Sequence, residues 1–228
     1  MYCRRRNCPP AEKRGRPEKS VSAGRTRQRR KASERPRMIV LMVLGTGSSV
    51  GVGHRAMEPI AKGIESAGGR IERLVLSHLR IERCRYCPEL LAPCRREGDC
   101  GIEDDFHAVV ERMRTADAVV FGCPACIGGL TPVFEAFFHR LVQLCRGEPG
   151  RRGLAGKAVA GVCVGGGADL SARTMTDLLA ACGFAVREVV SVTRRNLPVA
   201  TKALHDAGRG LVGAPPQPID HENLRRTG

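Results

Sequence analysis

Apolar runs of strand length alternate with amphipathic stretches of helical length from residue 38 onward. The apolar runs span residues 38–45, 70–77, 117–124, 157–167 and 184–192, and each predicts a buried strand. The amphipathic stretches span residues 54–67, 102–116, 130–145, 170–182 and 199–212, and each predicts a helix. This alternation predicts right-handed strand–helix–strand units and therefore a parallel sheet that helices cover on both faces.

Five such units over residues 38–212 predict an α/β domain with a flavodoxin-like doubly wound sheet, in which five parallel strands follow the order 2-1-3-4-5. In sheets of this kind ligands bind beyond the carboxyl ends of the strands, near the point where the strand order reverses. We therefore expect the chemistry in the loops that follow the first, third and fourth strands.

The two ends of the chain differ from this domain in composition. Residues 1–37 hold 14 of the 38 Lys and Arg but only 3 of the 23 Asp and Glu, so they carry +11 of the net charge of +15. We expect a disordered basic tail over 1–37, the domain over 38–212 and a frayed, proline-rich end over 213–228. An alternative for the tail is a natural start at Met38, because MIVLMVLG opens the first ordered element.

The basic tail does not by itself predict a nucleic-acid partner. Basic arms can contact phosphates, but no aromatic residues are interleaved with the charge here, so we expect a solvated tail. The chain also lacks the apolar segment of a secretory signal and any apolar run near the ~18 residues that span a bilayer. We expect no membrane association and a cytoplasmic location, where structural disulfides are rare.

Eleven cysteines in such a protein point to metal binding or redox chemistry. Four of them lie in CRYCPELLAPCRREGDC (84–100), a segment too polar to bury them in a core. Their spacing is C-x2-C-x6-C-x5-C, and they are Cys84, Cys87, Cys94 and Cys100. Four thiolates can hold a 4Fe-4S cluster or a zinc ion, and unligated redox-sensing thiols are the third interpretation. The neighbouring arginines are expected to lower the thiol pKa values; they are Arg83, Arg85, Arg95 and Arg96.

Glycine-rich loops follow the three strands at which we expect a ligand. GTGSSVGVGHR (45–55) combines close backbone approach, hydroxyl donors and a helix N-terminus, which favours a phosphate. GCPACIGGLTP (122–132) holds a Cys-x-x-Cys pair, Cys123 and Cys126, which is either a redox dithiol or, as we prefer, two small buried side chains beside a pocket. CVGGGADLS (163–171) offers three successive glycines.

The remaining titratable residues show no catalytic set. We expect His139 to be half-buried in an apolar helix, and Asp104 and Asp105 to be first-turn partners of a helix dipole. No side chain is assigned as a general acid or base.

Four stretches together resemble the flavodoxin-like, NAD(P)H-dependent FMN reductase superfamily, and most of all its iron–sulfur flavoprotein branch. They are GTGSSVGVGHR, the cysteine segment running into GDCGIEDDF, ADAVVFGCPACIGGLTPVFEAFFHR and GKAVAGVCVGGG, within about residues 38–190. The resemblance implies that residues 46–53 wrap the FMN phosphate, that 124–128 border the isoalloxazine ring and that 165–167 lie near its other edge. The implied cofactor-binding residues are Thr46, Ser48, Ser49, Val50, Gly51, Gly53, Pro124, Ala125, Cys126, Ile127, Gly128, Gly165, Gly166 and Gly167. Cys126 stands where the family usually has an aromatic residue.

By this resemblance the protein is an FMN-binding oxidoreductase with a 4Fe-4S cluster on the 84–100 loop. Its reductant is NAD(P)H or an electron-transfer protein, and it forms a homodimer or homotetramer. Two alternatives stay open on the residues alone. One is a zinc-stabilised flavodoxin-like binding module that has lost FMN, and the other is a thiol redox sensor.

Overall fold

A computed structural model describes residues 37–47, 51–88, 91–126 and 129–213 of the chain. The expected basic tail, apart from its last residue, and the expected frayed end, apart from its first, lie outside the described residues. Within them, five parallel strands form one sheet in the order β2-β1-β3-β4-β5, as predicted. The strands are β1 (Ile39–Leu44), β2 (Arg70–Val75), β3 (Ala118–Pro124), β4 (Ala158–Val164) and β5 (Ala185–Val192).

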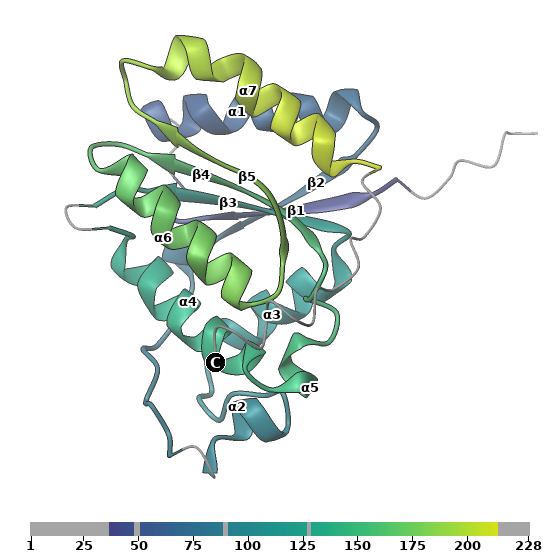
Figure 1. Ribbon diagram of the computed structural model, residues 1–228, viewed down its shortest axis with the longest axis vertical. Helices are drawn as coiled ribbons and strands as arrows, with labels where there is room; N and C mark the ends of the chain where they lie inside the picture. The colour runs from purple at the N-terminus through teal and green to yellow at the C-terminus, as the bar shows by residue number, and fades with distance from the viewer. Residues whose placement is uncertain (1–36, 48–50, 89–90, 127–128, 214–228) are drawn as a thin grey trace, which may run out of the picture. The chain divides into compact units, whose positions relative to one another are not determined.

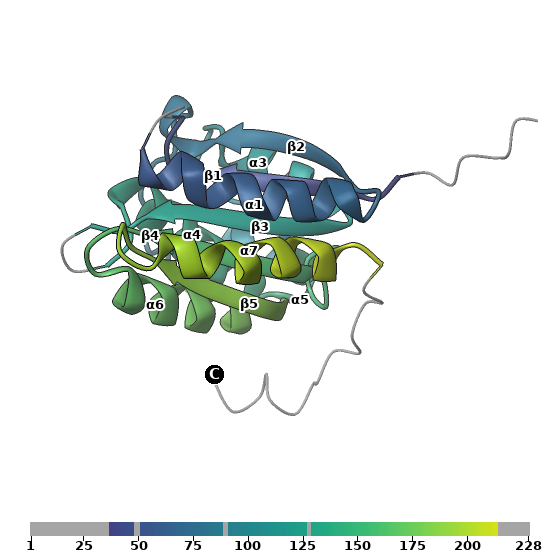
Figure 2. The same ribbon diagram turned by 90° about the horizontal axis from the view of Figure 1, so that it is seen from above.

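Helices cover both faces of this sheet (Figure 1). Helices α1 (Val52–Ser66) and α7 (Leu197–Leu211) lie together on one face, where the view from above shows them side by side (Figure 2). The opposite face carries α3 (Phe106–Thr115), α4 (Pro132–Cys145) and α6 (Ala168–Ala181).

Strand alternation divides the core between the two faces. On β1, Leu41 and Val43 pack with α3, α4 and α6, whereas Val40 and Met42 pack with α1 and α7. The central strands β3 and β4 are buried along almost their whole length. This explains why they appear in the sequence as continuous apolar runs rather than as alternating ones.

Helices α1 and α7 approach each other at two glycines. A Cβ atom added to Gly63 of α1 would lie 2.1 Å from the carbonyl oxygen of His205, and one added to Gly208 of α7 would lie 2.2 Å from that of Ile60. No side chain fits at such distances, so the two backbones can pack this closely only because both positions are glycine.

The structure corrects several predicted boundaries around the cysteine segment. The strand expected over 70–77 ends at Val75 and passes into a short 3-10 helix, η1 (Leu76–His78). The helix expected over 102–116 begins only at Phe106. Two single-turn helices that the sequence did not predict are α2 (Pro93–Arg96), inside the cysteine segment, and α5 (Glu148–Arg151), which follows α4. Among the described helices, none is long and apolar enough to cross a membrane.

Candidate functional site

Three glycine-rich loops leave the sheet at one edge, as the strand order predicts. Leu44 at the end of β1 pairs with Gly122, and Pro124 at the end of β3 pairs with Val164 at the end of β4. The backbone holds the loops in line beyond these ends, because the N–H of Gly45 donates to the carbonyl oxygen of Gly122 at 2.9 Å. The loops after β1, β3 and β4 therefore begin next to one another.

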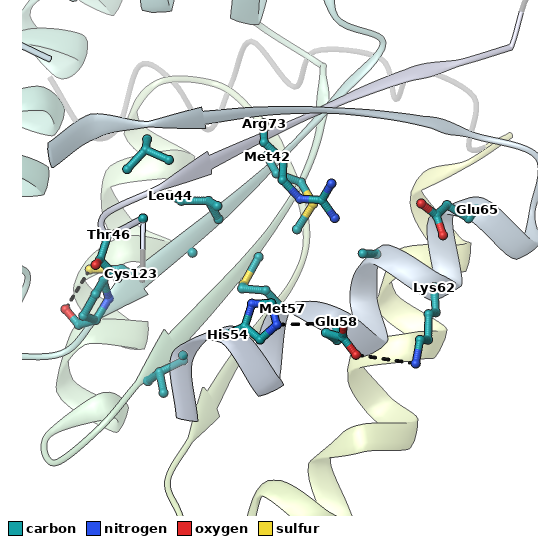
Figure 3. Close-up of a pocket in the computed structure, with 17 residues that line it drawn as sticks. Met42, Leu44, Thr46, His54, Met57, Glu58, Lys62, Glu65, Arg73 and Cys123 are labelled. Carbon is teal, nitrogen blue, oxygen red and sulfur yellow. Dashed lines mark hydrogen bonds and ion pairs between the residues drawn. The ribbon is translucent and has the colours of Figure 1, made fainter. Parts of the chain in front are cut away.

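A groove of about 450 Å³ opens at this edge (Figure 3). Three of the residues predicted to bind FMN, Thr46, Gly53 and Pro124, line it together. From there it continues between α1 and the sheet, where α1 side chains face Met42 and Leu44 of β1. The α1 residues that line this part include His54, Met57, Glu58, Lys62 and Glu65, and Arg73 lines it from β2. The groove is thus longer than the predicted phosphate loop, and its far end is charged.

Gly51 sets the start of α1 at the predicted phosphate loop. It is the N-cap residue, its φ is +95° and its ψ is −174°, a conformation that only glycine adopts without strain. No side chain caps the helix, and no acidic residue lies in its first turn. The first N–H groups of α1 have no partner within the helix, so this terminus can accept an anion.

The other predicted cofactor residues divide into two sets. Those after β3 and β4 lie side by side, since the Cβ position of Gly165 is 3.5 Å from the oxygen of Ala125 and that of Gly167 is 3.6 Å from the oxygen of Cys126. Six of the predicted cofactor residues do not line the groove: Gly51, Ala125, Cys126, Gly165, Gly166 and Gly167. The remaining ones lie outside the described residues: Ser48, Ser49, Val50, Ile127 and Gly128.

The Cys-x-x-Cys pair does not come together as a dithiol. Cys123 is fully buried and pairs in register with Cys163 of β4, whereas Cys126 is half-buried and bridges to Gly129. Hydrogen bonding with Cys163 lowers the pKa of Cys123, and the same contact together with burial raises the pKa of Cys163. The sulfur neighbour of Cys123 is therefore on the next strand, which sequence spacing cannot indicate.

The four cysteines of the 84–100 segment share a second cavity, of about 410 Å³. It is bounded by the cysteine segment and by the later turns of α4. Its volume falls in the range of about 300–1,000 Å³ that is usual for small-molecule and cofactor sites. Its lining includes all four thiols predicted as metal ligands, Cys84, Cys87, Cys94 and Cys100. The tertiary structure thus brings this predicted set together.

Tyr86 holds the backbone between the first two cysteines in an unusual conformation. Its φ is +48°, and it alone among the described non-glycine residues has a positive φ. This conformation directs its N–H to the sulfur of Cys84 at 3.4 Å. Its hydroxyl lies 3.1 Å from Nδ1 of His139, which is exposed and not half-buried as the sequence predicted. Strain of this kind is concentrated at binding sites, and an N–H directed at sulfur suits a thiolate.

The charged residues that line this cavity are all arginines: Arg85, Arg95, Arg140 and Arg146. Arg95 acts to lower the pKa of Cys94, as we expected of the neighbouring arginines, but that pKa is raised overall. Burial and the neighbouring thiols of Cys100, Cys84 and Cys87 raise it, and the opposite effect of Arg95 is smaller. A cationic centre bound by the thiolates would remove this repulsion at Cys94.

The donor set, four cysteine thiols around one cavity, is one that both a 4Fe-4S cluster and a tetrahedral zinc ion use. Among the described residues, no three His, Cys, Asp or Glu side chains converge closely enough to hold one metal ion. Tetrahedral zinc with Zn–S bonds of about 2.3 Å needs sulfurs roughly 3.8 Å apart. A 4Fe-4S cluster spaces its four thiolates more widely, around a core that needs a cavity.

The sequence did not predict the buried ion pair at the back of this cavity. Arg140 of α4 donates through Nη1 to Oδ2 of Asp104 at 2.5 Å. Asp104 lies ahead of α3, where it also accepts the N–H groups of Glu82 at 2.7 Å and Phe106 at 3.1 Å. Burial alone raises the pKa of Asp104, but these hydrogen bonds, led by that of Arg140, lower it overall.

The two aspartates lie just before the first turn of α3 and not within it as predicted, and Asp104 accepts the N–H of Phe106, the first residue of the helix. No acidic residue lies in the first turn of α3. Asp105 is the N-cap residue of the helix, and its carboxylate accepts the N–H of Arg80 at 2.7 Å. Both carboxylates hold the end of the cysteine segment to the chain that precedes it.

Comparison with known proteins adds independent information. Residues 38–200 match a family model described as NADPH-dependent FMN reductase. An iron-sulfur flavoprotein of Archaeoglobus fulgidus is 32% identical over 84 residues, which are 37% of this chain and 39% of that protein. An iron-sulfur flavoprotein of Methanocaldococcus jannaschii is 25% identical over 152 residues, which are 67% of this chain and 72% of that protein.

A solved structure with the same fold is the NAD(P)H:quinone oxidoreductase from Methanothermobacter marburgensis. Its TM-score is 0.55 at 18% identity, over 77% of this chain and 97% of that one. At this identity the similarity concerns the fold. The match to the Archaeoglobus protein spans well under half of that protein's length.

Proposed function

Because the chain belongs to the NADPH-dependent FMN reductase family, we propose that it is an FMN-binding oxidoreductase whose second redox group is a 4Fe-4S cluster on the 84–100 loop. FMN binding is supported by the edge of the sheet at which the loops after β1, β3 and β4 meet. Thr46, Gly53 and Pro124 line one groove there. The proposed cluster is supported by the four cysteine thiols that line one cavity.

The flavin phosphate would be held by the loop after β1 and the start of α1. The N–H groups of the first turn and the Thr46 hydroxyl would supply donors, and Gly53 and His54 of that turn line the groove. The ring would lie against the adjacent backbones of 124–126 and 165–167. When bound, FMN supplies both two-electron and one-electron chemistry, and the chain supplies orientation and charge.

The cluster would be ligated by Cys84, Cys87, Cys94 and Cys100. The Tyr86 N–H on Cys84 and the arginines around the cavity stabilise negative charge on the sulfurs. These features support a cationic centre held by the four thiols, and the cavity of about 410 Å³ around them favours a cluster over a single zinc ion.

Helix α4 connects the two candidate sites. It begins at Pro132, directly after the loop that follows β3, and its later residues Arg140 and Gln143 line the cysteine cavity. At 1.5 Å per residue, about 12 Å of helix separates Pro132 from Arg140. Electrons would thus move between centres that one rigid element positions. NAD(P)H or an electron-transfer protein is the proposed reductant.

Analysis of the full chain, purified anaerobically, tests this function. We expect flavin absorption with a broad iron–sulfur shoulder, about one FMN per chain, and about four iron and four sulfide per chain. Addition of NADPH or NADH under anaerobic conditions should bleach the flavin absorption. One zinc per chain without flavin would contradict the proposal and favour the binding-module alternative. Flavin without iron would contradict the proposed cluster but not the proposed FMN-binding reductase.

A further inference from the structure

Arg140 is a buried cation whose guanidinium group faces the cysteine cavity. Its side chain is 1% exposed, and it lines the cavity together with the four thiols. Arg85 and Arg146, which line the same cavity, are exposed to solvent. An arginine is almost never fully buried unless it is paired, so its position requires an explanation.

The contacts of Arg140 come from both ends of the cysteine segment. Nη1 donates to the carbonyl oxygen of Glu82 at 3.3 Å, two residues before Cys84, and to the carboxylate of Asp104 at 2.5 Å. Nη2 lies 3.5 Å from the carbonyl oxygen of Ile102, two residues after Cys100. The guanidinium carbon is 4.1 Å from the centre of the Phe106 ring. One side chain of α4 thus ties together the two ends of the loop.

The guanidinium also interacts with the sulfur of Cys100. Burial alone lowers the pKa of Arg140, but the hydrogen bond with Asp104 and the neighbouring Cys100 raise it overall, so the group stays charged. Asp104 neutralises this charge from the side of α3, whereas Cys100 is a ligand in the proposed cluster site. Arg140, and not Asp104, lines the cavity that the four thiols share.

We infer that Arg140 is a positioning residue for the cluster. Its side chain holds the two ends of the cysteine segment together, and its fixed positive charge beside Cys100 raises the reduction potential of the cluster. The inference rests on the proposed function. One electron added to the site makes it one charge more negative and requires no proton. A fixed cation that is itself only 1% exposed favours that added charge, and net charge and hydrogen bonds to sulfur are known to set cluster potentials.

The experiment uses full-length protein, purified anaerobically. Arg140→Gln alone leaves the Asp104 carboxylate buried without its partner, which is strongly destabilising. The main variant is therefore Arg140→Gln combined with Asp104→Asn, which removes both charges and keeps hydrogen-bonding groups. Arg146→Gln is the matched control, because it removes an exposed arginine from the same cavity. The first measurement is iron and sulfide content, followed by an EPR-monitored redox titration.

We expect the double variant to hold the cluster with a lower midpoint potential than the wild type. The ratio of reduced to oxidised cluster at a fixed potential should fall at least tenfold, which is about 59 mV for one electron. Arg146→Gln should change that ratio much less, because solvent screens its charge. Equal shifts in the two variants, or no shift in either, would overturn the effect on potential. Wild-type protein with flavin but no iron would overturn the proposed cluster and this inference with it.

A second measurement does not depend on the cluster. Trypsin digestion of metal-free protein, with the cut sites mapped by mass spectrometry, reports how often the loop opens around Arg83, Arg85 and Arg96. We expect cleavage there at least tenfold faster in the double variant than in the wild type, and Arg140→Lys, which keeps the charge, should be intermediate. Unchanged cleavage in the double variant would overturn the loop-closing role, including the case in which that variant binds no iron.

Discussion

Arg140 and Asp104 form an ion pair across 36 residues of sequence, with side chains that are 1% and 0% exposed. It joins α4 to the segment between the last cysteine and α3. Pairs of this kind contribute little net stability compared with apolar residues of similar size, but breaking one strands a buried charge. The pair therefore has a specific consequence for stability at low pH.

Acid should unfold this protein partly through Asp104. The pKa of its carboxyl is lower in the folded protein than its ordinary value of 3.8. Its contribution is therefore fully present above about pH 4 and is lost as the pH falls through the lower, folded value. Asp104→Asn should lower the free energy of unfolding near neutral pH by about 3 kcal/mol. Between about pH 5 and pH 2 the free energy of unfolding of this variant should fall less than that of the wild type, as measured by urea unfolding.

Asp206→Asn is the control for this prediction. The pKa of Asp206 is also lowered, by hydrogen bonding to Lys202 at 2.5 Å, but the pair is on the surface of α7. Its replacement should leave the acid slope almost unchanged, because solvent screens exposed pairs. A similar effect of the two substitutions would contradict the special role of the buried pair.

Cys94→Ser should abolish the iron and sulfide content while leaving FMN bound. Cys94 lines the cavity with the other three thiols, and its pKa is raised by burial and by those thiols. Cys126→Ser removes a half-buried cysteine that does not line the cavity, so iron content should stay at the wild-type level. Metal and sulfide analysis with absorption spectroscopy measures both. Loss of iron in both variants would contradict the assigned ligand set.

Gly51→Ala should weaken FMN binding at least tenfold. At φ +95° and ψ −174° alanine is strained by about 1–3 kcal/mol, and we expect relief of that strain to move the start of α1. Gly68→Ala also places alanine at a positive φ, +88°, just beyond the end of α1, with no atom within 4 Å of the new Cβ. It should lower stability without changing the Kd for FMN, which fluorescence quenching measures. Equal Kd values for the two variants would contradict the proposal that the N-terminus of α1 binds FMN.

Gly63→Ala should destabilise the domain by about 1–3 kcal/mol or more, because its Cβ overlaps the backbone of α7. Gly210→Ala is the matched substitution within α7, where nothing lies within 4 Å of the new Cβ. It should stabilise by about 0.5–1 kcal/mol through helix propensity. Thermal and urea unfolding of the two variants compare them directly, and a stable Gly63→Ala protein would show that the helices can move apart.

Local patterns in the sequence determined the architecture. The apolar runs of β1, β3 and β4 are long enough, and uniform enough, to require burial on both faces of a parallel sheet. That predicted the strand order, and the order placed three glycine-rich loops at one edge. The resemblance to the FMN reductase family, including its iron–sulfur branch, also came from the residues alone, and the family match and the named relatives confirm it.

Only the tertiary structure decided which side chains meet. The sequence shows Cys123 and Cys126 only as a Cys-x-x-Cys spacing, which we preferred to interpret as two small side chains beside a pocket. Strand register instead pairs Cys123 with Cys163, forty residues away. The sequence pattern did not single out Arg140, whereas the fold buries it beside Cys100 and Asp104. Periodicity reports which face of an element is buried. It carries no information about the partner on the opposing element, because that contact depends on how distant segments pack.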